Sequence, residues 1–103
     1  MENKLTVYIS GKISGEEPKE CRRKFERAEE FLQEKYQVIN PYNYIKGKES
    51  WADAMMRDFE LIRDKADVVF MLNDWTQSDG ARAEFYFARG CGKRILFEVM
   101  YKE

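Results

Sequence analysis

Histidine is entirely absent from the chain. Imidazole is the side chain that most often serves as a general base near neutral pH, and it is the commonest metal ligand. Ser-His and Cys-His catalysis and histidine-ligated metals are therefore excluded. Carboxylate clusters of the DxDxD kind, which bind metals through oxygen, are missing as well. The sequence predicts no metal site.

Cysteine and long apolar runs are scarce. Cys21 and Cys91 are the only two thiols, and the apolar run near the N-terminus is too short for an export signal. We therefore expect reduced cysteines in a cytoplasmic protein. No stretch approaches the ~20 apolar residues that span a bilayer, so a membrane is not an expected partner.

Neither sign of charge is in excess. Eighteen basic and nineteen acidic residues give a net charge of −1, and no basic stripe is present. A long nucleic acid is therefore not expected as a partner. With 103 residues, the chain is long enough for a single core, so we expect one domain over residues 1–103.

Apolar runs and helical spacings alternate along the chain. Strands are predicted at residues 5–10, 38–39, 67–72 and 94–99, and helices at residues 18–35, 50–66 and 79–91. This alternation is typical of α/β proteins and predicts a three-layer sandwich with a flavodoxin-like parallel sheet of four to five strands. Such sheets bind ligands beyond the carboxyl ends of their strands. The segments expected to form a site are residues 10–15, 40–50 and 73–84.

Glu84 is a carboxylate on the apolar side of the last predicted helix. Ala81, Phe85 and Ala88 follow a helical spacing, and Glu84 falls within the same stripe. The segment at residues 78–81 contains glycine and exposes backbone N–H groups that suit an anion. Two interpretations stay open. Glu84 is either a functional carboxylate in a cleft or a solvated residue at the edge of the stripe.

Asp58 is a second carboxylate close to an apolar stripe. It follows Met55 by three residues and precedes Ile62 by four. One interpretation pairs Asp58 with Arg57, Arg63 or a backbone group. The other directs it into the same cleft as the first carboxylate. Two carboxylates facing one cleft are the minimum equipment for glycosidic chemistry, because one attacks the anomeric carbon and the other manages protons at the leaving group.

Other candidate residues lie on the first predicted strand and in the loops. The phenol of Tyr8 points either into the cleft or into the core. The loop at residues 11–15 has two glycines but matches neither the Walker nor the dinucleotide pattern, so its indication of phosphate binding is weak. Trp51 and Trp75 could stack on a base, and packing is the alternative role for both.

Together these positions resemble the nucleoside 2-deoxyribosyltransferase-like superfamily, which includes the 2'-deoxynucleoside 5'-phosphate N-hydrolases. The closest likeness is to small bacterial and phage domains of mostly unassigned function, and it covers essentially the whole chain. The segments that carry the resemblance are residues 8–15 (YISGKISG), Asp58, residues 66–69 (ADVV), residues 78–84 (SDGARAE) and residues 92–96 (GKRIL).

The resemblance implies cleavage or transfer at the N-glycosidic bond of a (deoxy)nucleoside or its 5'-monophosphate, with no metal or organic cofactor. The residue matching Glu84 is the nucleophile or stabilises the sugar cation. The residue matching Asp58 assists proton transfer, and the one matching Tyr8 positions the glutamate. The partner is then a small nucleoside or nucleotide. The residues expected at its sugar–phosphate end are Gly11, Lys12, Ile13, Ser14, Ser78 and Gly80.

Two features of the sequence refine this expectation. Ser78 matches the serine of the hydrolase-like members, whereas the transferases tend to have aspartate at that position. Together with Lys12 and Ser14 nearby, this serine favours a nucleotide over a nucleoside as the substrate. Asp58 precedes Asp67 by nine residues, whereas the usual interval in the superfamily is eight. One additional residue rotates a helical side chain by about 100° around the helix axis. This shift favours a binding or sensing module without chemistry as an alternative. A glycohydrolase acting on NAD or a nucleotide second messenger is the other.

Three consecutive aromatic residues predict an assembly. Phe85, Tyr86 and Phe87 cover about 200° of the last helix, which is more than one sheet can bury. At least one ring should therefore project from the molecule. Exposed aromatic patches mark contact surfaces, and the superfamily resemblance also implies neighbouring subunits, so we expect a homodimer or higher oligomer. A tyrosine that is merely solvated is the alternative.

Overall fold

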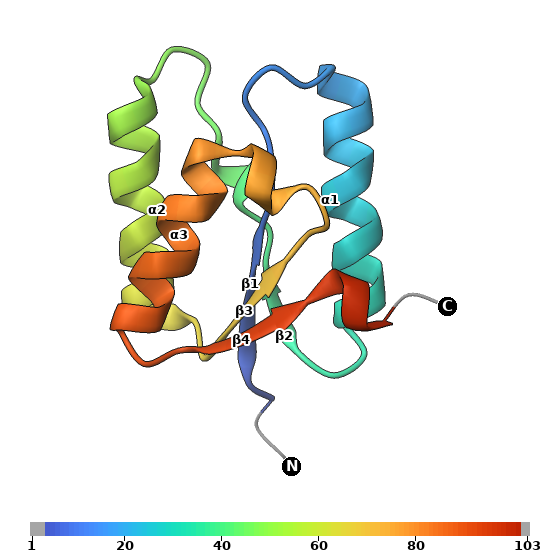
Figure 1. The fold of residues 1–103 in the computed structure, drawn as a ribbon. Coiled ribbons are helices and arrows are strands. Elements are labelled where there is room, and N and C mark those ends of the chain that lie inside the picture. The colour runs from blue at the N-terminus through green and yellow to red at the C-terminus, as the bar shows by residue number, and fades with distance from the viewer. Residues whose placement is uncertain (1–3, 102–103) are drawn as a thin grey trace.

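Residues 4–101, the part of the chain that the computed structural model describes, form four strands and three α-helices in alternation (Figure 1). Short 3-10 helices, labelled η, lie between them. In chain order the elements are β1 (Thr6–Ser10), α1 (Pro18–Leu32), β2 (Gln37–Ile39), η1 (Pro41–Tyr44), α2 (Trp51–Lys65), β3 (Val68–Met71), η2 (Trp75–Gln77), α3 (Asp79–Gly90), β4 (Arg94–Phe97) and η3 (Glu98–Tyr101).

The strands form one parallel sheet in the order β2-β1-β3-β4. Tyr8 in β1 lies opposite Ile39 of β2 and Val69 of β3, so the two inner strands end at nearly the same level. In a parallel sheet all carboxyl ends meet at one edge, and the loops that follow them converge there. That edge is where the loops predicted to form a site lie.

Helices cover both faces of the sheet (Figure 1). α1 packs on one face around Phe25, and α2 and α3 pack on the other around Ile62 and Ala88. The predicted three-layer α/β sandwich is therefore confirmed, with four strands. β3 is buried at every position, as expected for a central strand covered on both sides.

The alternation of β1 decides which of its side chains face the site. Val7 and Ile9 belong to the core beneath α1. Tyr8 belongs to the core on the opposite side, beneath α2 and α3. Successive strand residues point to opposite faces, so Ser10 lies on the same side as Tyr8. The carboxyl end of β1 thus presents two hydroxyl groups toward α3.

Some element ends differ from the predictions. α1 ends at Leu32 rather than at residue 35, and a turn follows in which the N–H groups of Lys35 and Tyr36 both bond to the Leu32 carbonyl. β4 ends at Phe97, since the Glu98 carboxylate accepts a bond from the Asn73 N–H at 2.8 Å and the chain turns into η3. The predicted loop after β2 contains η1. Within residues 4–101, no helix is both long and apolar enough to cross a bilayer.

Candidate active site

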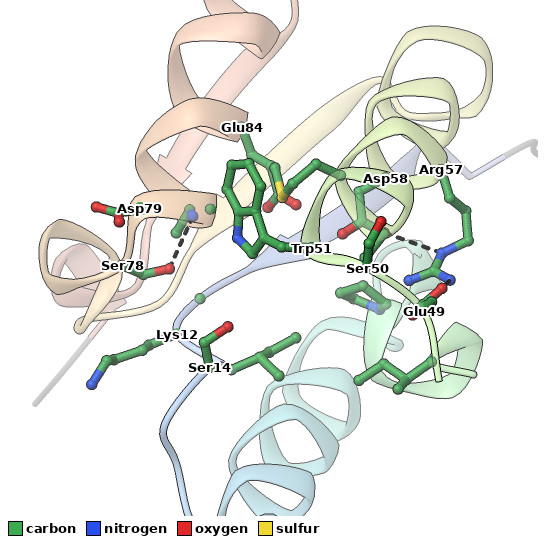
Figure 2. Close-up of a pocket in the computed structure, with 18 of the residues that line it drawn as sticks. Lys12, Ser14, Glu49, Ser50, Trp51, Arg57, Asp58, Ser78, Asp79 and Glu84 are labelled. Atoms are coloured by element: carbon green, nitrogen blue, oxygen red, sulfur yellow. Dashed lines mark hydrogen bonds and ion pairs between the residues drawn. The ribbon is translucent and has the colours of Figure 1, made fainter. Parts of the chain in front are cut away.

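A pocket of about 580 Å³ opens at the carboxyl edge of the sheet, between the starts of α2 and α3 (Figure 2). Its wall includes the three segments that the sequence predicted, namely the loop after β1, the segment leading into α2 and the start of α3, together with residues of β1 and α2. All nine predicted site residues line it, namely Tyr8, Gly11, Lys12, Ile13, Ser14, Asp58, Ser78, Gly80 and Glu84.

Glu84 lies at the base of this pocket and is only 5% exposed. The hydroxyl of Tyr8 donates to its Oε2 at 2.9 Å, and the hydroxyl of Ser10 donates to its Oε1 at 2.6 Å. Each carboxylate oxygen therefore has a donor from β1. The interpretation of Glu84 as a solvated residue is wrong, and that of a carboxylate in a cleft is confirmed.

Ser10 was not predicted as a site residue, although the signal for it is present in the sequence. It follows Tyr8 by two residues in a strand, so the two side chains share a face of the sheet. Its side chain is fully buried and its hydroxyl makes the shorter of the two bonds to Glu84. If the Tyr8 side chain faces the cleft, the Ser10 side chain therefore faces it too.

Asp58 lies on α2, lines the same pocket and is 7% exposed. Its Oδ1 lies 3.5 Å from Nε of Arg57, so the predicted pairing with Arg57 is confirmed. Asp58 therefore both pairs with Arg57 and lies in the pocket, so the two interpretations do not exclude one another. Among the described residues, Asp58 Oδ1 and Arg57 Nε are buried without a hydrogen-bond partner.

The end of α2, between Asp58 and Asp67, contains one turn that is wider than an α-helical turn. The N–H of Ala66 bonds to the carbonyl of Leu61 at 3.2 Å, five residues back instead of four. This wider turn places one more residue in the last turn of the helix. Asp58, two turns earlier, still faces the pocket.

Burial raises the pKa values of both carboxyls. Burial, and then the charge of Asp58, raise the pKa of Glu84 well above its usual range. Burial likewise raises the pKa of Asp58, which the Arg57 cation opposes. Burial and the Glu84 charge raise the pKa of Tyr8, which keeps its phenol a donor. The carboxyl pair therefore retains one proton at pH values where isolated carboxyls have lost theirs.

The loop after β1 is held in place by Asp74 and Lys24. Asp74 accepts the Lys12 N–H at 3.1 Å and the Lys24 amine at 2.6 Å, and this amine also bonds the Lys12 carbonyl at 2.7 Å. A side chain at Gly11 would lie 2.6 Å from Leu72 Cδ1, so only glycine fits where the loop leaves the sheet. The loop after β1, which forms part of the pocket wall, is thus held in place at Gly11 and at Lys12.

Two of the predicted phosphate contacts have other partners. Lys12 Nζ pairs with Glu16 at 3.3 Å and points away from the carboxyl pair (Figure 2). Ser78 caps α3, since its hydroxyl oxygen accepts the Ala81 N–H at 3.0 Å. Ser14 lies exposed at the rim. The Lys12 amine and the Ser78 hydroxyl oxygen are therefore both engaged by groups of the protein itself.

The two tryptophans, for which stacking on a base and packing were both open, lie in different places. Trp51, at the first position of α2, is 55% exposed and lines the pocket near Gly80. Arg57 and Glu49 also line the pocket. Trp75, by contrast, packs against Phe85 with ring centroids 4.7 Å apart, as the alternative interpretation had it.

The fold and the site define a class: an α/β protein with a parallel sheet and a buried carboxyl pair in a pocket at the carboxyl ends of its strands. Among the described residues, no group of three or more acidic or cysteine side chains is arranged to hold a metal ion. The chain belongs to the family described as a domain of unknown function (DUF4406), whose match covers residues 5–97. No curated protein matches it.

Proposed function

We propose that the protein cleaves or transfers at the N-glycosidic bond of a (deoxy)nucleoside or its 5'-monophosphate. The observation that carries this proposal is the buried pair of Glu84 and Asp58 in one pocket, with Glu84 held by two hydroxyl donors. Glycosidic cleavage needs one carboxylate at the anomeric carbon and one proton donor at the leaving group. The pair meets both needs when its single proton lies on Asp58, and the two hydroxyl donors at Glu84 favour the ionised form of that residue.

In the proposed reaction a Glu84 oxygen attacks C1' as the bond from C1' to the base nitrogen breaks. The electron pair of that bond leaves with the base, and Asp58 supplies the proton that the base takes up. Water or a second base then attacks C1' and releases Glu84, and the proton of the attacking group returns to Asp58. Tyr8 and Ser10 keep the attacking carboxylate oriented throughout.

The size and chemistry of the pocket support a nucleoside-sized ligand. A volume of about 580 Å³ is within the usual range for small-molecule sites. The start of α3, with the N–H groups of Asp79 and Gly80 outside the helical bonding pattern, suits a 5'-phosphate. Trp51, which lines the pocket near Gly80, offers an aromatic face to a base.

The test is a panel of nucleosides, their 5'-monophosphates and NAD, scored by chromatography for release of the free base. We expect base release from at least one nucleoside or monophosphate, and a fall of at least about a hundredfold in Glu84→Gln. Glutamine has the same shape but cannot attack C1'. Glu30→Gln, the same change at an exposed position of α1, is the matched control and should keep full activity.

Each other outcome identifies a different function. Near-normal turnover in Glu84→Gln would exclude Glu84 as the nucleophile. Nucleotide binding without any base release would indicate a binding module, and release of nicotinamide alone would indicate an NAD glycohydrolase.

A further inference from the structure

Arg57 and Glu49 form a charged pair in the pocket wall beside Asp58. Arg57 Nη1 donates to Glu49 Oε1 at 2.6 Å, and its Nε lies 3.5 Å from Asp58 Oδ1. All three residues line the pocket, and the Glu49 and Arg57 side chains are largely shielded from solvent. One guanidinium therefore faces two carboxylates. Only one of these, Asp58, belongs to the carboxyl pair.

We propose that Arg57 is a positioning residue that sets how tightly the pair of Asp58 and Glu84 holds its proton, and that Glu49 moderates its effect. This inference rests on the proposed function for its consequence in catalysis, but not for its physical basis. A cation within about 4 Å favours the charged form of a carboxyl. Glu49 in turn neutralises part of the guanidinium charge.

The surroundings of Asp58 leave Arg57 as its cationic neighbour among the described residues. Tyr8 of β1 and Glu84 of α3 are the other titratable groups that act on it, and neither is a cation. The remaining charged pocket residues have other positions: Lys12 pairs with Glu16, Asp79 pairs with Arg82, and Lys46 lies in the exposed loop before α2.

The geometry gives the two neighbours opposite effects. Without the Arg57 charge, the ionised form of Asp58 is less stabilised, so the pair keeps its proton to higher pH. Without the Glu49 charge, the Arg57 guanidinium acts on Asp58 at greater strength, so the pair loses its proton at lower pH. In the proposed reaction this proton goes to the leaving base, so the alkaline limit of activity should follow the same order.

The experiment is a titration of the Asp58 and Glu84 side-chain carboxyl carbons by NMR, in the full chain without substrate. Arg57→Met should move the upper titration of the pair to higher pH by roughly one pH unit, which is a tenfold change in proton affinity. Glu49→Gln keeps an oxygen for the Arg57 bond but carries no charge, and should move the titration to lower pH. Arg57→Lys, which keeps the charge, should titrate close to the wild type.

Arg63→Met is the matched control, because Arg63 is an exposed arginine on the same helix that pairs with Asp64 outside the pocket. It should leave the titration unchanged. An unchanged titration in Arg57→Met, or shifts of the same sign in Arg57→Met and Glu49→Gln, would overturn the proposal. If Arg57→Met does not fold, Glu49→Gln alone decides it by the sign of its shift. The titration needs no turnover, so its result is independent of whether the proposed reaction occurs.

Discussion

At the scale of single residues, Glu84 is a carboxyl in an unfavourable environment. It is buried next to a second carboxyl, and the two hydroxyl donors from β1 only partly replace the water that it loses. Buried carboxyls are retained where chemistry needs them, and they lower the stability of the fold. The stability of the protein should therefore depend on the charge of this residue.

We expect Glu84→Gln to be more stable than the wild type by about 1 kcal/mol at pH 8, and the difference to vanish near pH 4. Burial raises the pKa of Glu84 in the folded state, so the folded chain binds this proton more tightly than the unfolded chain. The stability linked to that proton is complete below the ordinary pKa of 4.5 and is lost as the pH rises through the raised value. Glutamine has no proton to lose.

Urea unfolding at several pH values measures this difference, with Glu30→Gln as the control whose stability should follow that of the wild type. A difference between Glu84→Gln and the wild type that stays constant from pH 4 to pH 8 would show that Glu84 has the same pKa in the folded and the unfolded chain, and would contradict the expectation.

At the scale of elements, the start of α3 has one side chain that caps the helix and also lines the pocket. The hydroxyl oxygen of Ser78 caps the helix by accepting the Ala81 N–H, and the same residue lines the pocket. Aspartate caps helices as well as serine does. The two roles can therefore be separated by changing the charge and keeping the cap.

Ser78→Asp should leave the free energy of unfolding within about 0.5 kcal/mol of the wild type, because the cap is kept. It should weaken a 5'-monophosphate at least tenfold more than the matching nucleoside, because two negative charges then face one another in a partly shielded site. The kcat/KM ratio of the two substrates measures this effect. Ser78→Asn, a neutral cap, is the control and should leave the ratio near its wild-type value. Equal losses on both substrates would place the phosphate elsewhere.

The elements also show where sequence reasoning succeeds. Glu84 could be placed in a cleft because an apolar helical stripe rarely includes a carboxylate, and strand alternation could have added Ser10. Arg57 could be named only as one possible partner of Asp58. Its bond to Glu49 depends on how the segment before α2 folds back, and no periodic pattern describes that segment. For a related reason the sequence could not decide whether Trp51 packs or lines the pocket, since helical spacing does not show where a sheet ends.

At the scale of the whole molecule, the layer architecture followed from the sequence because strands and helices alternate and parallel connections have one hand. The edges of the sheet were less predictable. The last strand was expected to reach residue 99, yet β4 ends at Phe97, where a side-chain bond of Glu98 to the loop after β3 turns the chain. Long-range contacts of this kind leave no local pattern.

The aromatic run on α3 is divided as predicted: Phe85 and Phe87 pack against the core, while Tyr86 is 65% exposed. We expect a homodimer or higher oligomer that covers this ring. Light scattering at micromolar concentration should give a mass of at least twice 12.3 kDa, and Tyr86→Lys should reduce it to that of one chain. Tyr44→Lys, at an exposed tyrosine of η1, is the control and should not. A single 12.3 kDa species for the wild type would contradict the expectation.

The hydroxyl bond from Tyr8 to Glu84 joins residues that are 76 positions apart. A refolding chain must therefore close a loop of most of its length before this bond forms, and contacts of such separation are slow to form. β1 has to dock beside β3, and α3 has to dock on both, before the pocket has a base. Partly folded chains would contain helices and strands but no site, so the recovery of binding or turnover would mark the last stage of folding rather than the first.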